Sequence, residues 1–513
     1  MPISQRKTPG VYVTELDGFP PSVVGVETAV PLFVGYTETA NGSGTSLLHT
    51  AQKVRSSAEF TAIYGGTARP EFTLRKASQT DCDLQLSDAS GTPRYYDVVR
   101  IGPALPILAT AMRLFYDNGG GDCYVVSVGD FVQAQQGIDV EKLIGGLDVG
   151  GRVDGPTLLA VPDGVLLDSA AEFQTLVQAM LAQCGTLQDR FAILDIFGTE
   201  KIDPDSAVLA RDMSELIETF RTQAGDDYLS YGASYFPFLA TSCVARDDVD
   251  FQMFENAPLR DVLAGQAAVL YEGARLDYVT ALIARTAEAN LTLVEVTALD
   301  QDLCAALPAM TELETVVAAR MGQLPPSAAI AGVYAAGDRD VGVWKAPGNA
   351  ALASVNAPTL AISDAMQEDM NVPPGGKAVD AIRNFPGRGT VVWGARTLDG
   401  NSSDWRYISV RRTAIYIEQS LKAAFAQLVF APNDAATWST AVSMAADFLR
   451  GLWAGGGLAG STAGQAYNVQ CGLGATMTAQ DILEGQMIVQ VTIAPLRPAE
   501  FIVLSFRQQM QTG

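Results

Sequence analysis

Short apolar runs alternate with helix-like segments through the first half of the chain, and this alternation constrains the fold more than any other feature. Short, mainly apolar runs predict buried strands at residues 29–36, 123–128, 157–162 and 190–195. Helical spacing predicts helices at 107–116, 170–183 and 208–222. Because alternating strands and helices form βαβ units, the pattern predicts a largely parallel sheet.

At 513 residues the chain is long enough for roughly two to four domains. The α/β pattern is interrupted twice, the second time by a mostly helical stretch with one expected strand at 291–296, and it resumes at 328–334. Pro373-Pro374-Gly375-Gly376 is the best linker. The predicted parts are an N-terminal extended arm (1–20), a middle α/β domain (21–66 with 101–244 and 323–370), a small β insertion (67–100), a helical insertion (245–322) and a C-terminal domain (371–513).

The C-terminal stretch 405–506 has the most informative pattern. We expect it to open with a strand at Tyr407, Ile408 and Val410, followed by a helix and then by a second helix at 436–454 that Asp434 caps. Met487, Val489, Val491 and Ile493 then alternate with polar residues, as in a half-buried strand. The final run 501–504 is apolar on both faces, which predicts a strand that is covered on both sides, by another subunit among the candidates.

The N-terminal segment contains one isolated strand. Residues 11–15 have strand character, and prolines stand on both sides of them. No partner strand follows at hairpin distance. The strand therefore pairs either with a sheet edge of another molecule or with a sheet of its own chain, and the pattern alone leaves both open.

Charge is distributed unevenly along the chain, with a formal net charge of −23. Residues 371–513 hold 11 Lys and Arg against 9 Asp and Glu, whereas residues 21–370 hold 21 against 46. This asymmetry suggests a contact-making core and a solvated acidic body. The negative charge argues against nucleic acid and anionic membranes as partners. Neither a secretory signal nor a membrane-spanning segment is expected.

The sequence offers little catalytic or metal-binding chemistry. His49 is the single histidine and lies in an expected loop, so a Ser-His or Cys-His catalytic pair is improbable. The six cysteines are scattered without metal-ligand spacing and are expected as free thiols. The GxGxxG match at 455–460 follows a helix where a dinucleotide site needs a strand. We therefore predict no catalytic residue, no cofactor and no metal site, and interpret the frequent carboxylates as a solvated face.

Many stretches along the chain, taken in order, carry a family resemblance. They are 8–13, 21–26, 33–37, 118–121, 123–126, 189–195, 325–328, 331–335, 342–347 and, most fully, Tyr407-Ile408-Ser409-Val410-Arg411-Arg412, Tyr416-Ile417-Glu418, Phe430-Ala431-Pro432-Asn433-Asp434, Phe448-Leu449-Arg450-Gly451-Leu452-Trp453 and Pro498-Ala499-Glu500-Phe501. This ordered set resembles the sheath protein of contractile phage tails and related contractile injection systems. Only 67–100 and 245–322 lie outside it.

The resemblance implies a structural subunit and not an enzyme. Such subunits polymerise helically around an inner tube, and the sheath contracts to drive the tube through a target envelope. The implied partners are further copies of the chain in stacked hexameric rings, the inner tube protein, and baseplate and terminal cap proteins. Nucleic acid and membrane insertion are not implied. The implied location is the cytoplasm during assembly and then a phage tail or phage-tail-like particle, released or cell-anchored.

The resemblance also implies a multidomain α/β and α+β fold, whose α+β C-terminal sheath domain is completed by strands from neighbouring subunits. The implied strand-exchange residues are Val11, Tyr12, Val13, Thr14, Glu15, Met487, Val489, Val491, Phe501, Ile502, Val503 and Leu504. The implied hinges are Pro9, Gly10, Pro20 and Pro21. The implied inner-tube contacts on helix 436–454 are Thr437, Ser439, Ser443, Asp447 and Arg450. This helix has less positive charge than is usual in the family, since Arg450 is its one basic residue.

A second interpretation is a cytoplasmic α/β enzyme or nucleotide-binding protein. Its support is the βαβ pattern, which identifies a fold but not a function. The missing phosphate loop, the single histidine and the misplaced glycine motif argue against it.

Overall fold

The computed structural model describes residues 23–42, 44–79, 82–87 and 92–502. The chain divides into two compact units, the larger containing residues 27–415 and the segment from 497, and the smaller containing residues up to 26 and 416–496. The division falls inside helix α13 (Ile408–Phe425), beyond the boundary expected at 371. The difference arises because strands β15 (Asp380–Phe385) and β16 (Gly389–Val392) lie in the main sheet of the larger unit.

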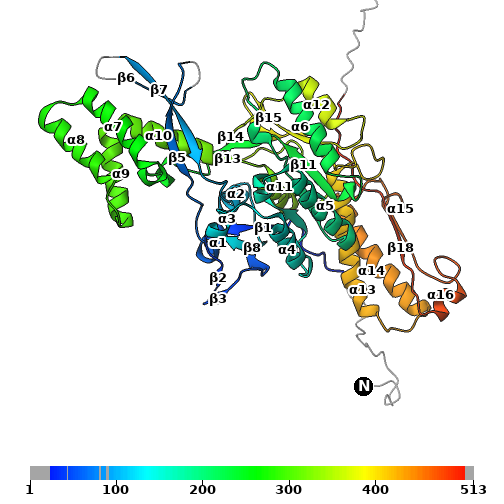
Figure 1. Cartoon of the computed structure of the whole chain (residues 1–513). Helices are drawn as coiled ribbons and strands as arrows, with labels where there is room; N and C mark the ends of the chain where they lie inside the picture. The colour runs from blue at the N-terminus through cyan, green and yellow to red at the C-terminus, as the bar shows by residue number, and fades with distance from the viewer. Residues whose placement is uncertain (1–22, 43, 80–81, 88–91, 503–513) are drawn as a thin grey trace, which may run out of the picture. The chain divides into compact units, whose positions relative to one another are not determined.

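An eight-stranded sheet forms the centre of the larger unit, in the order β16-β15-β11-β10-β9-β1-β8-β4. Its strands β15, β11, β1 and β8 are labelled in Figure 1. All neighbouring pairs from β15 to β8 are parallel, and β16 and β4 are antiparallel edge strands. The remaining strands are β1 (Pro31–Thr37), β4 (Gln52–Val54), β8 (Cys123–Asp130), β9 (Leu158–Ala160), β10 (Phe191–Leu194) and β11 (Gly232–Phe236). The predicted parallel-sheet core is confirmed.

Helices cover both faces of this sheet. Helices α4 (Val140–Gly151), α5 (Ala170–Leu187) and α6 (Leu209–Gln223) share one hydrophobic core with Leu32 and Val34 of β1. Helices α2 (Leu108–Asp117) and α11 (Ser327–Asp340) share the other core with Phe33. All seven residues of β1 are buried, because its alternating side chains meet apolar helices on either side.

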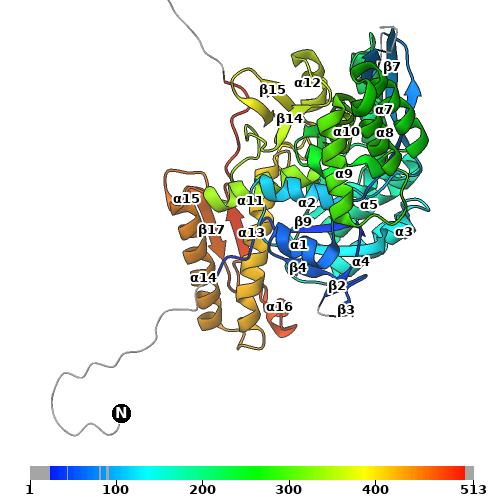
Figure 2. The same cartoon turned by 90° about the vertical axis from the view of Figure 1, so that its left-hand side faces the viewer.

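The two insertions pack together, although about 150 residues separate them in the sequence. Strands β5 (Glu71–Lys76), β7 (Pro93–Ile101) and β6 (Leu84–Ser87) form an antiparallel sheet. Helices α7 (Asn256–Leu270), α8 (Gly273–Arg285), α9 (Leu293–Ala306) and α10 (Pro308–Met321) lie beside it in both views (Figure 2). A third hydrophobic core joins Phe72 and Leu74 of β5 to Leu259 of α7 and Leu313 of α10.

Two predicted strands are wrong. Ile408 and Val410 belong to the first turn of α13, where residues 408–415 are all buried, and Tyr407 just before the helix forms a single β-bridge with Arg396. Because the polar residues Ser409, Arg411, Arg412 and Thr413 are buried together with the apolar ones, the apolar residues of this stretch do not recur with a helical period. The strand expected at 291–296 is the start of α9, which Thr292 and Glu295 begin as a reciprocal capping box.

The other elements of the larger unit are short. A second three-stranded sheet has the order β13-β12-β14. The elements are β2 (Asn41–Gly42), β3 (Thr45–Ser46), β12 (Leu239–Thr241), β13 (Gln323–Leu324), β14 (Val355–Pro358), α1 (Ser57–Tyr64), α3 (Phe131–Ala134) and α12 (Asp364–Asn371). Within the described part of the chain, no helix combines the length and the apolar character needed to cross a bilayer.

The smaller unit is α+β. It holds the second half of α13, α14 (Ala435–Ala454), α15 (Ala463–Ala466), α16 (Ala479–Leu483) and an antiparallel pair of strands, β17 (Tyr467–Gln470) and β18 (Gln490–Ile493). Asp434 caps α14 as predicted, accepting hydrogen bonds from the backbone of Ala436 and Thr437. Figure 2 shows α14 beside the second half of α13, where the rings of Tyr416 and Phe448 lie 5.8 Å apart.

Candidate functional site

One set of the predicted site residues lies outside the described residues. Residues 11–15, the hinges Pro9, Gly10, Pro20 and Pro21, and Val503 and Leu504 are in the segments 1–22 and 503–513. For them the strand-exchange prediction stays a prediction. The other predicted residues lie on three surfaces, which we describe in turn.

The first surface is the β17–β18 sheet of the smaller unit. Val491 of β18 pairs with Val469 and Ile493 with Tyr467, and these four side chains are half-buried on one face. The alternate residues Asn468, Gln470, Gln490 and Thr492 are exposed. Met487 and Val489 precede the strand. Among the described residues neither strand has a second neighbour in its sheet, so each presents an edge to which a further strand can pair.

The second surface is the exposed stripe of α14. Ser439, Asp447 and Arg450 are exposed and share one side of the helix with the half-buried Ser443. Thr437 is half-buried and lies outside this stripe, four residues before the buried Ala441. Asp447 and Arg450 form an ion pair of 3.2 Å between exposed side chains, so their charges largely neutralise each other. The opposite face buries Ala441, Met444, Ala445, Leu449 and Leu452. The stripe is thus polar and nearly neutral, which suits a contact made by shape and hydrogen bonds.

The third surface is the C-terminal segment 497–502 of the larger unit, where Phe501 and Ile502 are 72% and 80% exposed and lie in no strand. Glu500, just before them, is firmly held. The guanidinium of Arg396 binds its carboxylate through Nε–Oε1 of 2.8 Å and Nη2–Oε2 of 2.6 Å, and the hydroxyl of Tyr407 donates to Oε2 at 3.1 Å. Burial works against ionisation, yet these hydrogen bonds hold the pKa of Glu500 below its ordinary value.

We define these three residues, Arg396, Tyr407 and Glu500, as the C-terminal clamp. Sequence analysis missed the clamp as a unit, since Arg396 and Glu500 lie 104 residues apart. The available signal was the motif Pro498-Ala499-Glu500-Phe501, in which a carboxylate precedes an apolar run. Long-range charge pairs of this kind are not encoded in local periodicity.

Ligands of parallel α/β sheets bind at the carboxyl ends of the strands, and two buried acids lie there. Asp163, which follows β9, accepts hydrogen bonds from the backbone of Tyr36, Ile107 and Leu108 at 2.8–3.1 Å. Asp195, which follows β10, accepts 2.8 and 2.5 Å hydrogen bonds from the backbone and hydroxyl of Ser327 at the start of α11. Both acids are therefore engaged in fixing helix starts. The single histidine, His49, is exposed in the loop between β3 and β4.

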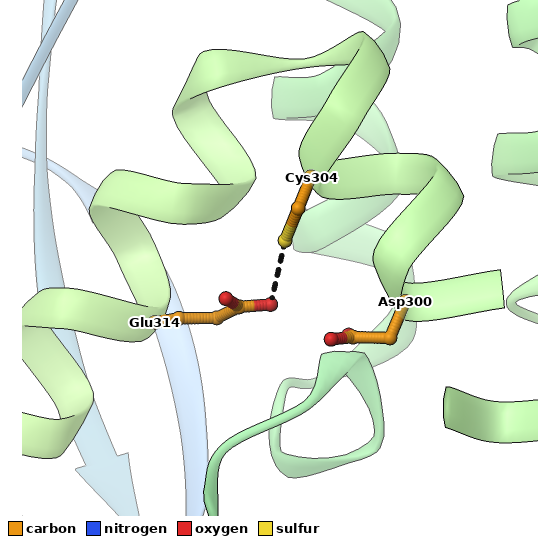
Figure 3. A group of neighbouring side chains, drawn as sticks. All are labelled: Asp300, Cys304 and Glu314. Atoms are coloured by element: carbon orange, nitrogen blue, oxygen red, sulfur yellow. Dashed lines mark hydrogen bonds between the residues drawn. The ribbon is translucent and has the colours of Figure 1, made fainter. Parts of the chain in front are cut away.

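One group of potential metal ligands stands out among the described residues, Asp300 and Cys304 of α9 with Glu314 of α10 (Figure 3). Their ligand atoms lie within 4.8 Å of one another. The thiol of Cys304 donates to Oε1 of Glu314 at 3.0 Å, and burial raises the pKa of Glu314 to about 8. Nε of Arg246 lies 3.7 Å from the other oxygen of Glu314. The group thus satisfies its own hydrogen bonds and has a positive charge beside it, so its chemistry calls for no ion.

The C-terminal part of the chain matches a known family. Residues 401–509 match the family of phage tail sheath C-terminal domains. The match covers about a fifth of the chain, which is thus similar in its C-terminal part to contractile tail sheath proteins, as the sequence resemblance predicts.

The similar solved chains come from structures of two particles, the anti-feeding prophage and PVC. A chain of the anti-feeding prophage helical sheath in its contracted state is 26% identical, and the match covers 98% of this chain and 100% of that one with a TM-score of 0.60. A chain of the anti-feeding prophage baseplate gives the same values. The sheath complex of PVC, an extracellular contractile injection system, in its contracted state is 26% identical with 98% coverage of both chains and a TM-score of 0.58. No curated protein sequence matches the chain.

Proposed function

We propose that this chain is the structural subunit of a contractile sheath, which polymerises helically around an inner tube and contracts to drive the tube through a target envelope. The observation that carries the proposal is the end-to-end likeness, over 98% of this chain and 100% of the other, to a subunit of a contracted helical sheath. A likeness of this extent includes both the core and the peripheral insertions.

The subunits are joined by exchanged strands in this proposal. A two-stranded sheet is marginal by itself, and the β17–β18 sheet offers two edges in the described chain. The isolated strand 11–15 and the apolar run 501–504 are the donors, and β17–β18 of neighbouring copies is the acceptor. Backbone hydrogen bonds of added strands survive rotation of the bodies, while Pro9-Gly10 and Pro20-Pro21 act as hinges.

The partners follow from the same proposal. The near-neutral C-terminal part faces the inner tube through Thr437, Ser439, Ser443, Asp447 and Arg450, and the acidic body faces outward. Like charges on neighbouring bodies oppose unspecific adhesion as they slide. Stacked hexameric rings, a baseplate and a terminal cap complete the particle, which assembles in the cytoplasm. The alternative, an α/β enzyme, finds no support in the two buried acids at the strand ends, since Asp163 and Asp195 accept hydrogen bonds that fix the starts of helices.

The experiment that tests the proposal is expression of the chain with and without its inner tube protein, followed by sedimentation and negative-stain electron microscopy. We expect long tubes, of wider diameter where the sheath has contracted. A sharp, small oligomer at all concentrations, with no tubes under either condition, would contradict the proposal.

A further inference from the structure

The C-terminal clamp is a built carboxylate site rather than a surface ion pair. The side chain of Arg396 is 3% exposed and that of Glu500 is 14% exposed. The guanidinium is fixed before it meets the carboxylate, since Nη1 donates to the backbone carbonyls of Asn371 and Gly400 at 3.0 and 3.2 Å. Its backbone is fixed as well, because Arg396 and Tyr407 form a β-bridge. The site is therefore rigid and matched to one carboxylate.

Glu500 is the residue by which the C-terminal segment is held. Residues 496–502 have no secondary structure. The neighbouring ion pair between Arg497 and Asp404 is long, at 3.9 Å, and both side chains are more than half exposed. Such a pair contributes little, whereas breaking a buried pair is costly because it leaves an unpaired charge behind. Beyond Glu500, the side chains of Phe501 and Ile502 project without cover.

We propose that the C-terminal clamp anchors the exchanged C-terminal strand to the α/β core of its own subunit, so that tension from a neighbouring copy is transmitted through Glu500 to Arg396. This inference rests on the proposed sheath function and names the residues that regulate its strand exchange. An anchor at residue 500 fixes where the donated segment starts and in which direction it leaves. Fixing its start raises its effective concentration at the neighbour's sheet edge, without any new contact between the copies.

The test uses the full-length chain and compares the variants R396Q, E500Q and Y407F with the matched control R497Q. R497Q makes the same charge change as R396Q and lies on the same segment as Glu500, but it removes only the exposed pair with Asp404. The critical protein concentration for tube formation is measured by sedimentation. We expect it to rise about tenfold or more in R396Q and E500Q, less in Y407F, and to stay unchanged in R497Q.

A second measurement separates loss of the anchor from loss of folding. The unfolding equilibrium of unassembled R396Q, E500Q and the double variant R396Q/E500Q is compared with wild type. In the double variant, the unfolding equilibrium constant should be smaller, by about tenfold or more, than the product of the two single effects predicts, because no unpaired charge is left behind. The double variant should nevertheless assemble as poorly as either single variant.

Three outcomes would overturn the anchor. If the effects of R396Q and E500Q on the free energy of unfolding simply add in the double variant, the clamp is not formed. If the two effects on unfolding are coupled but R396Q forms tubes at the same critical concentration as wild type, the proposed anchor is rejected while the sheath function stands. Failure of the wild-type chain to form tubes would reject the sheath function, and the anchor with it.

Discussion

The guanidinium of Arg412 and the carboxylate of Asp338 form a two-pronged ion pair, with Nη1–Oδ1 of 3.0 Å and Nη2–Oδ2 of 2.6 Å. Each side chain is 5% exposed. The pair joins the last turn of α11 to the first turns of α13, and the ring of Tyr334 covers the guanidinium at 4.5 Å. It therefore fixes the start of α13 within the larger unit.

Removing one charge of this pair should be costly. In D338N the side chain keeps its shape, but Arg412 loses its counter-charge in a buried position, and we expect a loss of about 3–5 kcal/mol in the free energy of unfolding. Urea denaturation of the unassembled chain measures it. The matched control is D340N, which removes the exposed pair with Arg339 and should cost less than about 1 kcal/mol. If D338N and D340N lowered the free energy of unfolding equally, burial would not be what makes the Arg412–Asp338 pair important.

The buried Asp195 should make stability depend on pH. Burial raises its pKa to about 7, although the hydrogen bonds from Ser327 oppose the shift. A pKa that is raised in the folded state gives stability that is complete below the unfolded value near 4 and is lost as the pH rises through about 7. The residue therefore destabilises the larger unit progressively between these values.

The variant D195N cannot ionise, so it should lose less stability than wild type between pH 4.5 and 7.5. The difference should reach up to about 4 kcal/mol, since each pKa unit is worth about 1.4 kcal/mol. Denaturation curves at several pH values measure it. D205N, which changes an exposed loop aspartate, should follow the wild-type profile. A D195N profile parallel to that of wild type would show that Asp195 stays ionised throughout.

Two kinds of element were predictable from the sequence: helices buried on one side, and short strands buried on both faces. β1, β8, β9 and β10 are mainly apolar runs, and their alternation with helices predicts the parallel sheet. The first turns of α13 were mistaken for a strand because tertiary packing buries them on all sides. The start of α9 was mistaken because Leu293 and Val294 look strand-like, although Thr292-x-x-Glu295 signals a helix start.

The candidate site was predictable only where it is local. Val491 and the polar stripe of α14 follow from periodicity. The clamp depends on Arg396 meeting Glu500 across 104 residues, and such pairs are set by the tertiary fold. The same holds for the acids at the strand ends, whose roles emerge only from the backbone groups they contact.

The N-terminal arm should be needed for assembly and not for folding. Deleting residues 1–16 removes the predicted donor strand but none of the described cores, so thermal unfolding of the unassembled chain should be unchanged. Electron microscopy should show no sheath tubes. As a control, the T14A variant keeps the strand backbone and should assemble normally. Ordinary tubes from the deletion variant would refute the role of the arm.

The exposed stripe of α14 should contact the inner tube. S439R adds a bulky cation there, and we expect co-sedimentation with the inner tube protein to fall by about tenfold or more because close packing is blocked. The matched control S214R makes the same change at an exposed serine of α6 and should bind the tube normally. Equal binding by both variants would place the tube contact elsewhere.

The central claim is that each copy donates its ends to the β17–β18 sheets of other copies. The most direct measurement is a cryo-electron microscopy reconstruction of the assembled tubes at a resolution that traces every strand. The account predicts a sheet enlarged by strands from neighbouring copies, with the segment after Glu500 leaving its own subunit. Both ends folded back onto their own subunit, with a two-stranded β17–β18 sheet in every copy, would contradict it.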